Sequence, residues 1–203
     1  MTSIRAAAAV VTLAALSAFA LSGRAVGEDK AEYVGDKACQ KCHFQEHKSW
    51  KKTGMAKAMK SLAPTAEADD KALFDKKTAA KLDPAKDYTT DATCLKCHTT
   101  GYGTDTGYPK DPKADEAAGK RAAAFGGVSC EACHGPGSLY VKHKTAELEK
   151  NKDAKFTTET LAPMGMIKPD QKLCETCHNA DNPTKGELKY EEDKAKTHDH
   201  PKK

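Results

Sequence analysis

"GVSCEACHGPG", at residues 127–137, places two cysteines three positions apart and a histidine directly after the second. A Cys-x-x-Cys pair occurs in zinc sites, redox dithiols and haem attachment sites, so one copy leaves the chemistry open. This chain contains four copies, and the other three begin at Cys39, Cys94 and Cys174. The recurrence therefore decides how the chain is expected to fold.

All four copies continue into a histidine, and together they use every one of the eight cysteines in the 203-residue chain. The residues are Cys39, Cys42 and His43; Cys94, Cys97 and His98; Cys130, Cys133 and His134; and Cys174, Cys177 and His178. Two thiols on one helical turn can bond to the two vinyl groups at one porphyrin edge, and the adjacent histidine then ligates the iron. The pattern predicts four covalently bound haem c groups, with the four histidines as proximal ligands.

Three other uses of these cysteines explain less of the pattern. Paired zinc knuckles could use eight thiols, but they give no reason for a histidine after every second cysteine. Disulfides would suit an exported chain, yet a bridge across so short a span is usually catalytic. A redox dithiol normally occurs once, near a βαβ pattern, and no such pattern is visible.

The first 25 residues are predicted to be a signal peptide. A positively charged start, residues 1–5, precedes an unbroken run of apolar and small residues over 6–21, and small residues suited to cleavage follow at Ala25 and Gly27. A bilayer-spanning helix needs about 20 apolar residues, more than this run supplies. We therefore expect Sec-dependent export to the periplasm and no stable membrane insertion after cleavage. The attachment of haem to Cys-x-x-Cys-His outside the bacterial cytoplasm agrees with export.

The remaining residues, 26–203, are predicted to form a single tetrahaem domain. Only 6% of the chain is aromatic and 31% is charged, which is little apolar material for an ordinary core. Four porphyrins would supply the missing apolar surface, so the haems are expected to form the core. The predicted fold is mainly α with extensive irregular chain, a multihaem cytochrome c architecture. Helices are expected over 42–61, 66–81, 138–150, 169–178 and 186–198, with Ser138 as a helix cap and a loop over 99–112.

The charge pattern does not indicate nucleic-acid binding. The formal net charge is +4, and the lysines are scattered among acidic residues without a basic stripe or aromatic residues to stack on bases. We therefore expect redox protein partners and no nucleic acid.

The sixth iron ligands must come from outside the four motifs. The remaining histidines are His47, His143, His198 and His200. His143 lies on a predicted helix and is a good candidate, whereas His47 follows His43 by one turn and is expected to be a surface residue. Methionine is the other usual axial ligand. Met55 and Met59 share one helical face, although such a stripe more often serves packing.

Longer stretches around the motifs resemble the cytochrome c-554 family. They are "CQKCHFQEHKSWKKTGMAKAMKSL", "AKLDPAKDYTTDATCLKCHTTGYG" and "GVSCEACHGPGSLYVKHK", and the resemblance extends from Cys39 to His178. Members of this family are tetrahaem periplasmic cytochromes that accept electrons from hydroxylamine oxidoreductase. The resemblance implies closely spaced haem pairs, three haems with two axial ligands, and a five-coordinate second haem.

Carried over by position, the resemblance also implies a ligand set. His143 would cap the first haem, the second haem would have an open face, and His198 would cap the fourth. The family has a histidine where this chain has Met55, which becomes the candidate sixth ligand of the third haem, with a vacant iron or a neighbour such as Met59 as the alternatives. Because a thioether raises the reduction potential relative to imidazole, the third haem would then be the easiest to reduce. The tail is short, so His200 remains an alternative to His198.

Two functions follow from this reading. The first is an electron carrier between a donor similar to hydroxylamine oxidoreductase and an acceptor such as another cytochrome or a quinone-linked membrane protein. The second is an enzyme that reduces nitric oxide or a similar small nitrogen ligand at the open haem. The sequence near Cys94–His98 shows no evident proton-delivery cluster. Tyr102, Asp105 and Tyr108 lie nearby, but a Gly-rich loop is sufficient to explain their presence. The carrier is therefore favoured, with no catalytic residue assigned.

Overall fold

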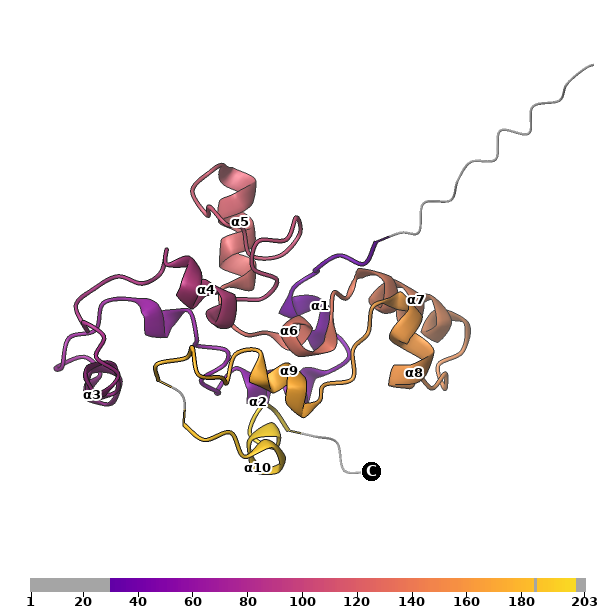
Figure 1. Ribbon diagram of the computed structural model, residues 1–203. Helices are drawn as coiled ribbons and strands as arrows, with labels where there is room; N and C mark the ends of the chain where they lie inside the picture. The colour runs from indigo at the N-terminus through magenta and orange to yellow at the C-terminus, as the bar shows by residue number, and fades with distance from the viewer. Residues whose placement is uncertain (1–29, 185, 200–203) are drawn as a thin grey trace, which may run out of the picture.

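The computed structural model describes residues 30–184 and 186–199. The predicted signal peptide and His200 lie outside the described residues. Within them the chain forms short helices joined by long irregular segments, and no residue of these ranges is in a β-strand (Figure 1). The predicted fold class is confirmed. None of the helices in these ranges is long and apolar enough to cross a bilayer.

The helices follow the chain in this order: α1 (Asp36–Gln40), α2 (Phe44–Trp50), α3 (Lys71–Ala79), α4 (Ala92–His98), α5 (Glu116–Phe125), α6 (Cys130–His134), α7 (Ser138–Lys150), α8 (Thr158–Leu161), α9 (Gln171–Glu175) and α10 (Tyr190–Lys194). Two 3₁₀ turns lie at Lys60–Leu62 and Ala162–Met164. The motifs fall on or beside α1, α4, α6 and α9, so the helices with the haem-binding residues are mostly a single turn or two long.

The predicted helices differ in how well they match. The helix expected over 138–150 is α7, with the same bounds. The helix expected over 42–61 ends at Trp50, because the Thr53 hydroxyl donates to the Trp50 carbonyl at 2.7 Å and accepts from the Ala56 amide at 3.3 Å. Such local side-chain bonds compete with helical ones, and Gly54 follows directly. The other three predictions shrink to α3, α9 and α10.

One helix cap was predicted wrongly, and one helix was not predicted. Ser138 is the first residue of α7 and Gly137 is its N-cap, so the predicted cap is wrong. The Ser138 hydroxyl instead accepts from the Glu32 amide at 2.8 Å, which ties the N-terminal segment to α7. Helix α5 was not predicted, although Asp115 caps it by accepting from the Ala118 amide at 2.7 Å.

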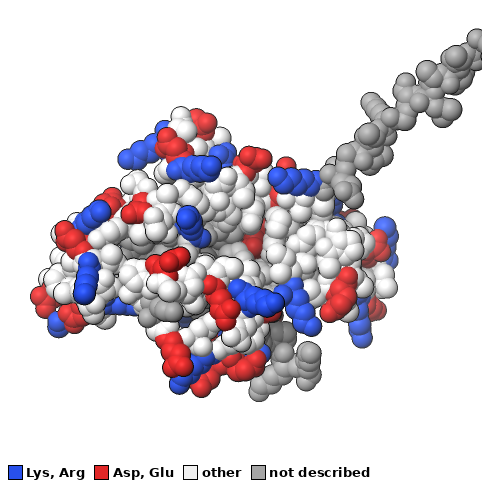
Figure 2. All heavy atoms as spheres, viewed as in Figure 1, with Lys and Arg blue, Asp and Glu red and all other residues white. Residues whose placement is uncertain are grey.

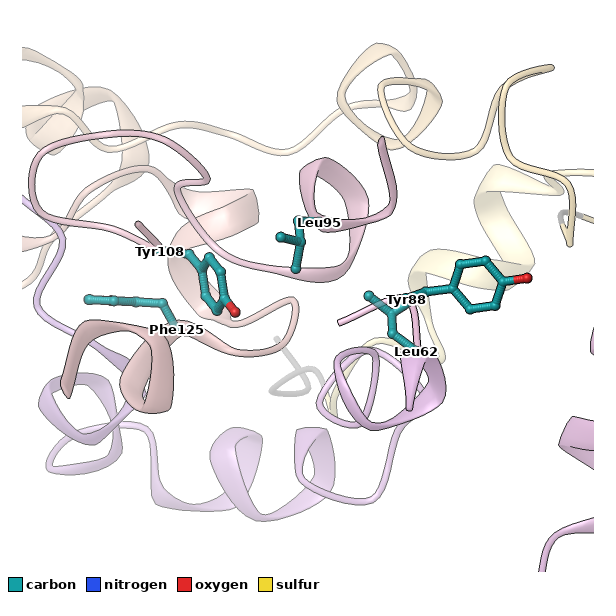
Figure 3. Packing of buried hydrophobic residues seen from close by; sticks show 5 residues of the cluster. All are labelled: Leu62, Tyr88, Leu95, Tyr108 and Phe125. Carbon is teal, nitrogen blue, oxygen red and sulfur yellow. The ribbon is translucent and has the colours of Figure 1, made fainter. Parts of the chain in front are cut away.

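A small side-chain core lies beside the second motif. Figure 3 shows its five buried members, Leu62, Tyr88, Leu95, Tyr108 and Phe125. Leu95 lies within the second motif itself and is 1% exposed. The predicted loop over 99–112 is irregular, as expected, but it contributes the buried Tyr108. The core of apolar side chains is thus as small as the composition suggested.

A buried hydroxyl connects the second motif to the third. Thr100 lies two residues after His98 and is completely buried. Its Oγ1 donates to the Gly127 carbonyl at 2.7 Å and accepts from the Ser129 amide at 2.9 Å, next to Cys130. Because buried polar groups are costly unless paired, this network holds the two motifs in a fixed relation.

Candidate haem-binding site

Each motif winds as one helical turn. The third motif is α6 itself, and the second forms the end of α4. In the first and fourth motifs the histidine amide donates to the carbonyl of the first cysteine at 2.9 Å, from His43 to Cys39 and from His178 to Cys174. The local backbone therefore has the geometry that two-point attachment to one porphyrin edge requires.

All eight cysteines have free thiols, so the disulfide alternative is not seen. The thiols of different motifs lie close together. The Cys130 thiol, hydrogen-bonded to that of Cys39, raises the pKa of Cys39, and burial adds to the rise. Figure 1 shows the helices that carry them, α1 and α6, side by side. The first and third motifs are thus adjacent.

The fourth motif lies between the second and the third. Burial, followed by the neighbouring Cys177, raises the pKa of Cys97 to about 11. Burial also raises the pKa of Cys133 to about 11, with Cys174 and Cys177 as the next contributions. Cysteines of the fourth motif therefore interact with both neighbours. Taken together, the thiols connect the motifs in the order second, fourth, third, first.

The imidazole of His98 is oriented by the backbone. Its Nδ1 lies 2.7 Å from the Ala58 carbonyl oxygen and 3.3 Å from the Ser61 hydroxyl. A carbonyl can only accept, so Nδ1 carries the proton and Nε2 is left as the ligating nitrogen. Proximal histidines are commonly fixed in this way, because the second hydrogen bond sets both tautomer and ring direction.

His134 and His198 are neighbours. Their ring centres lie 6.4 Å apart, with an interplanar angle of 41°. Metal–imidazole bonds of about 2.0–2.1 Å, with the distance from nitrogen to ring centre added on each side, put two rings on one metal roughly 6 Å apart. The His198 Nδ1 lies 2.7 Å from the Asp199 carbonyl oxygen, so Nδ1 carries the proton. The resemblance paired His198 with the fourth motif, whereas the structure places it beside the third.

The expected cap of the first haem lies on a helix that passes close to that motif. His143 belongs to α7, and its ring contacts Phe156 at 6.1 Å between ring centres. The next residue, Lys144, lies near His43: burial first and then the Lys144 ammonium lower the pKa of His43. This placement of α7 is compatible with His143 as a ligand of the first haem.

The two methionines have different surroundings. Met59 packs against the side-chain core, which is the usual role of a buried methionine. Met55 is half-buried, and its carbonyl accepts from the Val128 amide at 3.0 Å, two residues before Cys130. The segment that carries both residues also provides the Ala58 carbonyl that orients His98.

The expectation that His47 is a surface residue is wrong. It is 6% exposed, and its Nε2 lies 2.7 Å from the Asp36 carboxylate. The pair joins α1 to α2 on either side of the first motif. Sequence reasoning missed this role because nothing in the residue spacing indicates that the chain reverses between the two helices.

Apolar side chains lie exposed near the motif histidines. Phe44 follows His43 and is 55% exposed, and Ile167, whose amide donates to the His134 carbonyl at 2.9 Å, is 45% exposed. Large apolar side chains beside iron-ligating positions are suited to packing against a porphyrin. Paired thiols, oriented imidazoles and this apolar surface fit the chemistry of covalent haem.

A mainly helical chain wound around four such motifs is a multihaem c-type cytochrome. The family described as "Cytochrome c554 and c-prime" matches residues 38–135. Cytochrome c-554 of Nitrosomonas europaea is 36% identical over 170 residues, 82% of this chain and 66% of that protein. The reduced-state structure of cytochrome c554 from the same organism has a TM-score of 0.58 at 37% identity, over 73% of this chain and 65% of that one.

The chain belongs to the cytochrome c-554 family and accordingly has four covalently bound haem c groups. It spans slightly less than two thirds of the length of these two relatives. The family assignment made from the sequence stretches around the motifs is confirmed.

Proposed function

We propose that this protein is a periplasmic tetrahaem electron carrier, exported with a signal peptide over residues 1–25 and active as a single domain over 26–203. The observation that carries the proposal is the proximity of thiols from different motifs: Cys130 is hydrogen-bonded to Cys39, Cys177 to Cys97, and Cys133 is close enough to Cys174 for their charges to interact. Haems attached to thiols in contact lie close enough to exchange electrons directly. Such a path needs no substrate pocket.

Haem supplies the one-electron chemistry between ferric and ferrous iron. The chain contributes attachment, ligation and orientation. The eight motif cysteines form the thioether bonds, and His43, His98, His134 and His178 are the proximal ligands. Ala58 orients the His98 ring through its carbonyl, and Thr100 holds the second motif against the third.

The sixth ligands are proposed from the same geometry. His198 caps the third haem because its ring lies at the separation from His134 that a shared iron requires. His143 caps the first haem. Met55, whose carbonyl accepts from the Val128 amide beside the third motif, remains a candidate ligand without an assigned iron, and the second haem keeps an open face. The haem that Met55 ligates is accordingly the easiest to reduce, since His/Met ligation raises the potential.

The partners are proposed to be redox proteins, with a donor similar to hydroxylamine oxidoreductase and a cytochrome or quinone-linked membrane protein as acceptor. Figure 2 shows lysines and acidic residues interspersed over the face in view. Mixed charge of this kind suits transient docking, because neither sign forms a large field that would hold a partner tightly.

An open second haem also admits a second function, the reduction of nitric oxide or a similar ligand. What favours it is that the resemblance implies a five-coordinate second haem and that none of His143, Met55 and His198 is assigned to that iron. One experiment separates the two functions. The ferrous protein should bind about one equivalent of carbon monoxide, and nitric oxide with excess reductant should bind without sustained turnover. Continued consumption of nitric oxide would instead identify an enzyme, and binding of no ligand would remove the open haem.

A further inference from the structure

Glu131 is a buried carboxylate inside a haem-attachment motif. It lies between Cys130 and Cys133, is 1% exposed, and is the only buried acidic residue within the described ranges. The fourth motif has Glu175 at the same position, and that side chain is exposed. Burial at this position is therefore a property of the third motif, which the attachment chemistry does not require.

The carboxylate accepts only from backbone amides. Oε1 accepts from Gly137 at 2.7 Å and from Val34 at 2.9 Å, and Oε2 accepts from Gly35 at 2.7 Å and from Val34 at 3.2 Å. The N-terminal segment and the loop after His134 thus converge on one side chain. A carboxyl proton would need an acceptor, and these contacts are all donors, so the ionised form fits the site.

Burial raises the pKa of Glu131, and the amides of Val34, Gly35 and Gly137 oppose that rise. The opposing donors explain how a carboxylate is kept in a site with little water. The N–H groups act as fixed dipoles that partly replace hydration.

Glu131 lies where the first and third motifs meet. Its charge contributes to the raised pKa of Cys39, after the hydrogen bond from Cys130 and burial. The charged groups that act on Cys94, Cys97 and Cys174, in the second and fourth motifs, are other residues. Asp36 is a second carboxylate near Cys39, and it lies 2.7 Å from the His47 ring nitrogen Nε2.

We propose that Glu131 is a positioning residue that sets the redox asymmetry of this protein by lowering the reduction potentials of the first and third haems relative to the second and fourth. A negative charge in a low-dielectric site stabilises the more positive, oxidised state of a nearby iron, and its effect falls with distance. Each step it biases is a single electron that converts one ferric iron to ferrous, with no bond made or broken. The electron comes from the protein's redox donor.

This inference rests on the proposed electron-carrier function and extends it. Electrons that enter the chain would collect on the second and fourth haems, because the other end is held at lower potential by the buried charge. The carrier would therefore present its electrons at the end that contains the open haem.

The test is a spectroelectrochemical titration of the holoprotein, with the four haems distinguished by EPR or NMR. Glu131→Gln should raise the midpoint potentials of the first and third haems and leave those of the other two in place. Glu131→Asp keeps the charge and should restore most of the wild-type order. Equal shifts in all four haems, or no shift, would overturn the proposal.

Two matched controls separate charge from structure. Glu175→Gln removes a charge from the same motif position at an exposed site, where solvent screens it, and should shift no haem potential by as much as Glu131→Gln shifts the first and third. Ser138→Ala releases the Glu32 amide, so it loosens the same N-terminal segment without changing charge. Should Ser138→Ala reproduce the Glu131→Gln shifts, the effect is structural and the proposal fails.

If Glu131→Gln does not yield folded holoprotein, titration of the wild-type protein still tests the predicted order of reduction. The first and third haems must then be the last two to be reduced, and reduction of either before the second or fourth contradicts the proposal. If the Glu131 proposal is right but the carrier function is wrong, the outcome is different. The potentials would shift as predicted, but the reduced protein would pass no electrons to an oxidised cytochrome.

Discussion

The ring centres of His134 and His198 lie 6.4 Å apart, although one residue belongs to the third motif and the other to the C-terminal tail. Two imidazoles at this separation can share one iron. The relationship is the basis for proposing His198 as the ligand of the third haem and not of the fourth.

We expect His198→Ala to remove one bis-histidine haem from the EPR spectrum of the oxidised protein and replace it with a high-spin signal. The reason is that loss of the imidazole opens one axial position of the third iron. His143→Ala is the matched comparison, since it should open the first haem instead. A change that maps to the haem on Cys174 and Cys177 in the His198 variant would refute the assignment.

Met55→Leu should abolish a sulfur-to-iron charge-transfer band in the oxidised near-infrared spectrum and lower the highest of the four midpoint potentials. A thioether ligand raises the reduction potential of its iron. Met59→Leu keeps the size of a side chain that packs on the core and should leave the band intact. If wild-type protein lacks such a band, Met55 is not a ligand of any haem.

Asp36→Ala should lower the unfolding free energy of the holoprotein by about 1–3 kcal/mol, because it leaves the buried His47 ring without its partner. Chemical denaturation followed by haem absorbance measures this. Asp75→Ala breaks an ion pair with Lys71 whose two side chains are 57% and 66% exposed, and should cost much less than Asp36→Ala. Equal losses in both variants would mean that the buried pair does not hold α1 and α2 together.

Thr100→Val should destabilise the protein by about 1–3 kcal/mol, since it removes a buried hydroxyl that both donates to Gly127 and accepts from Ser129. Thr100→Ser retains that hydroxyl and is expected to lose less than half as much. Thermal unfolding of the two variants provides the comparison. A valine variant as stable as the serine variant would show that this link between the second and third motifs is energetically unimportant.

The sequence alone was sufficient to predict the helical turn of each motif and α7, because both depend on local spacing. Cys39 to His43 and its three repeats need only one helical turn, and α7 is a continuous helical stretch bounded by Gly137 and Asn151. The helix expected over 42–61 failed at Thr53, where a hydroxyl bonds to the local backbone and ends the regular pattern.

The long-range contacts could not be predicted in the same way. Glu131 meets Val34 across 97 residues, and His198 reaches His134 from the tail. Neither contact has a signature in residue spacing, because both depend on how irregular segments are folded back over the motifs. The burial of His47 could not be predicted for the same reason. Its partner, Asp36, lies on a separate short helix.

Coulometric titration of the purified, exported protein tests the central claim most directly. Four attached haems in mutual contact should take up four electrons per polypeptide and release all four to an oxidised cytochrome. Uptake of fewer than four electrons, or a fraction that stays trapped on reoxidation, would contradict a continuous path through the four motifs.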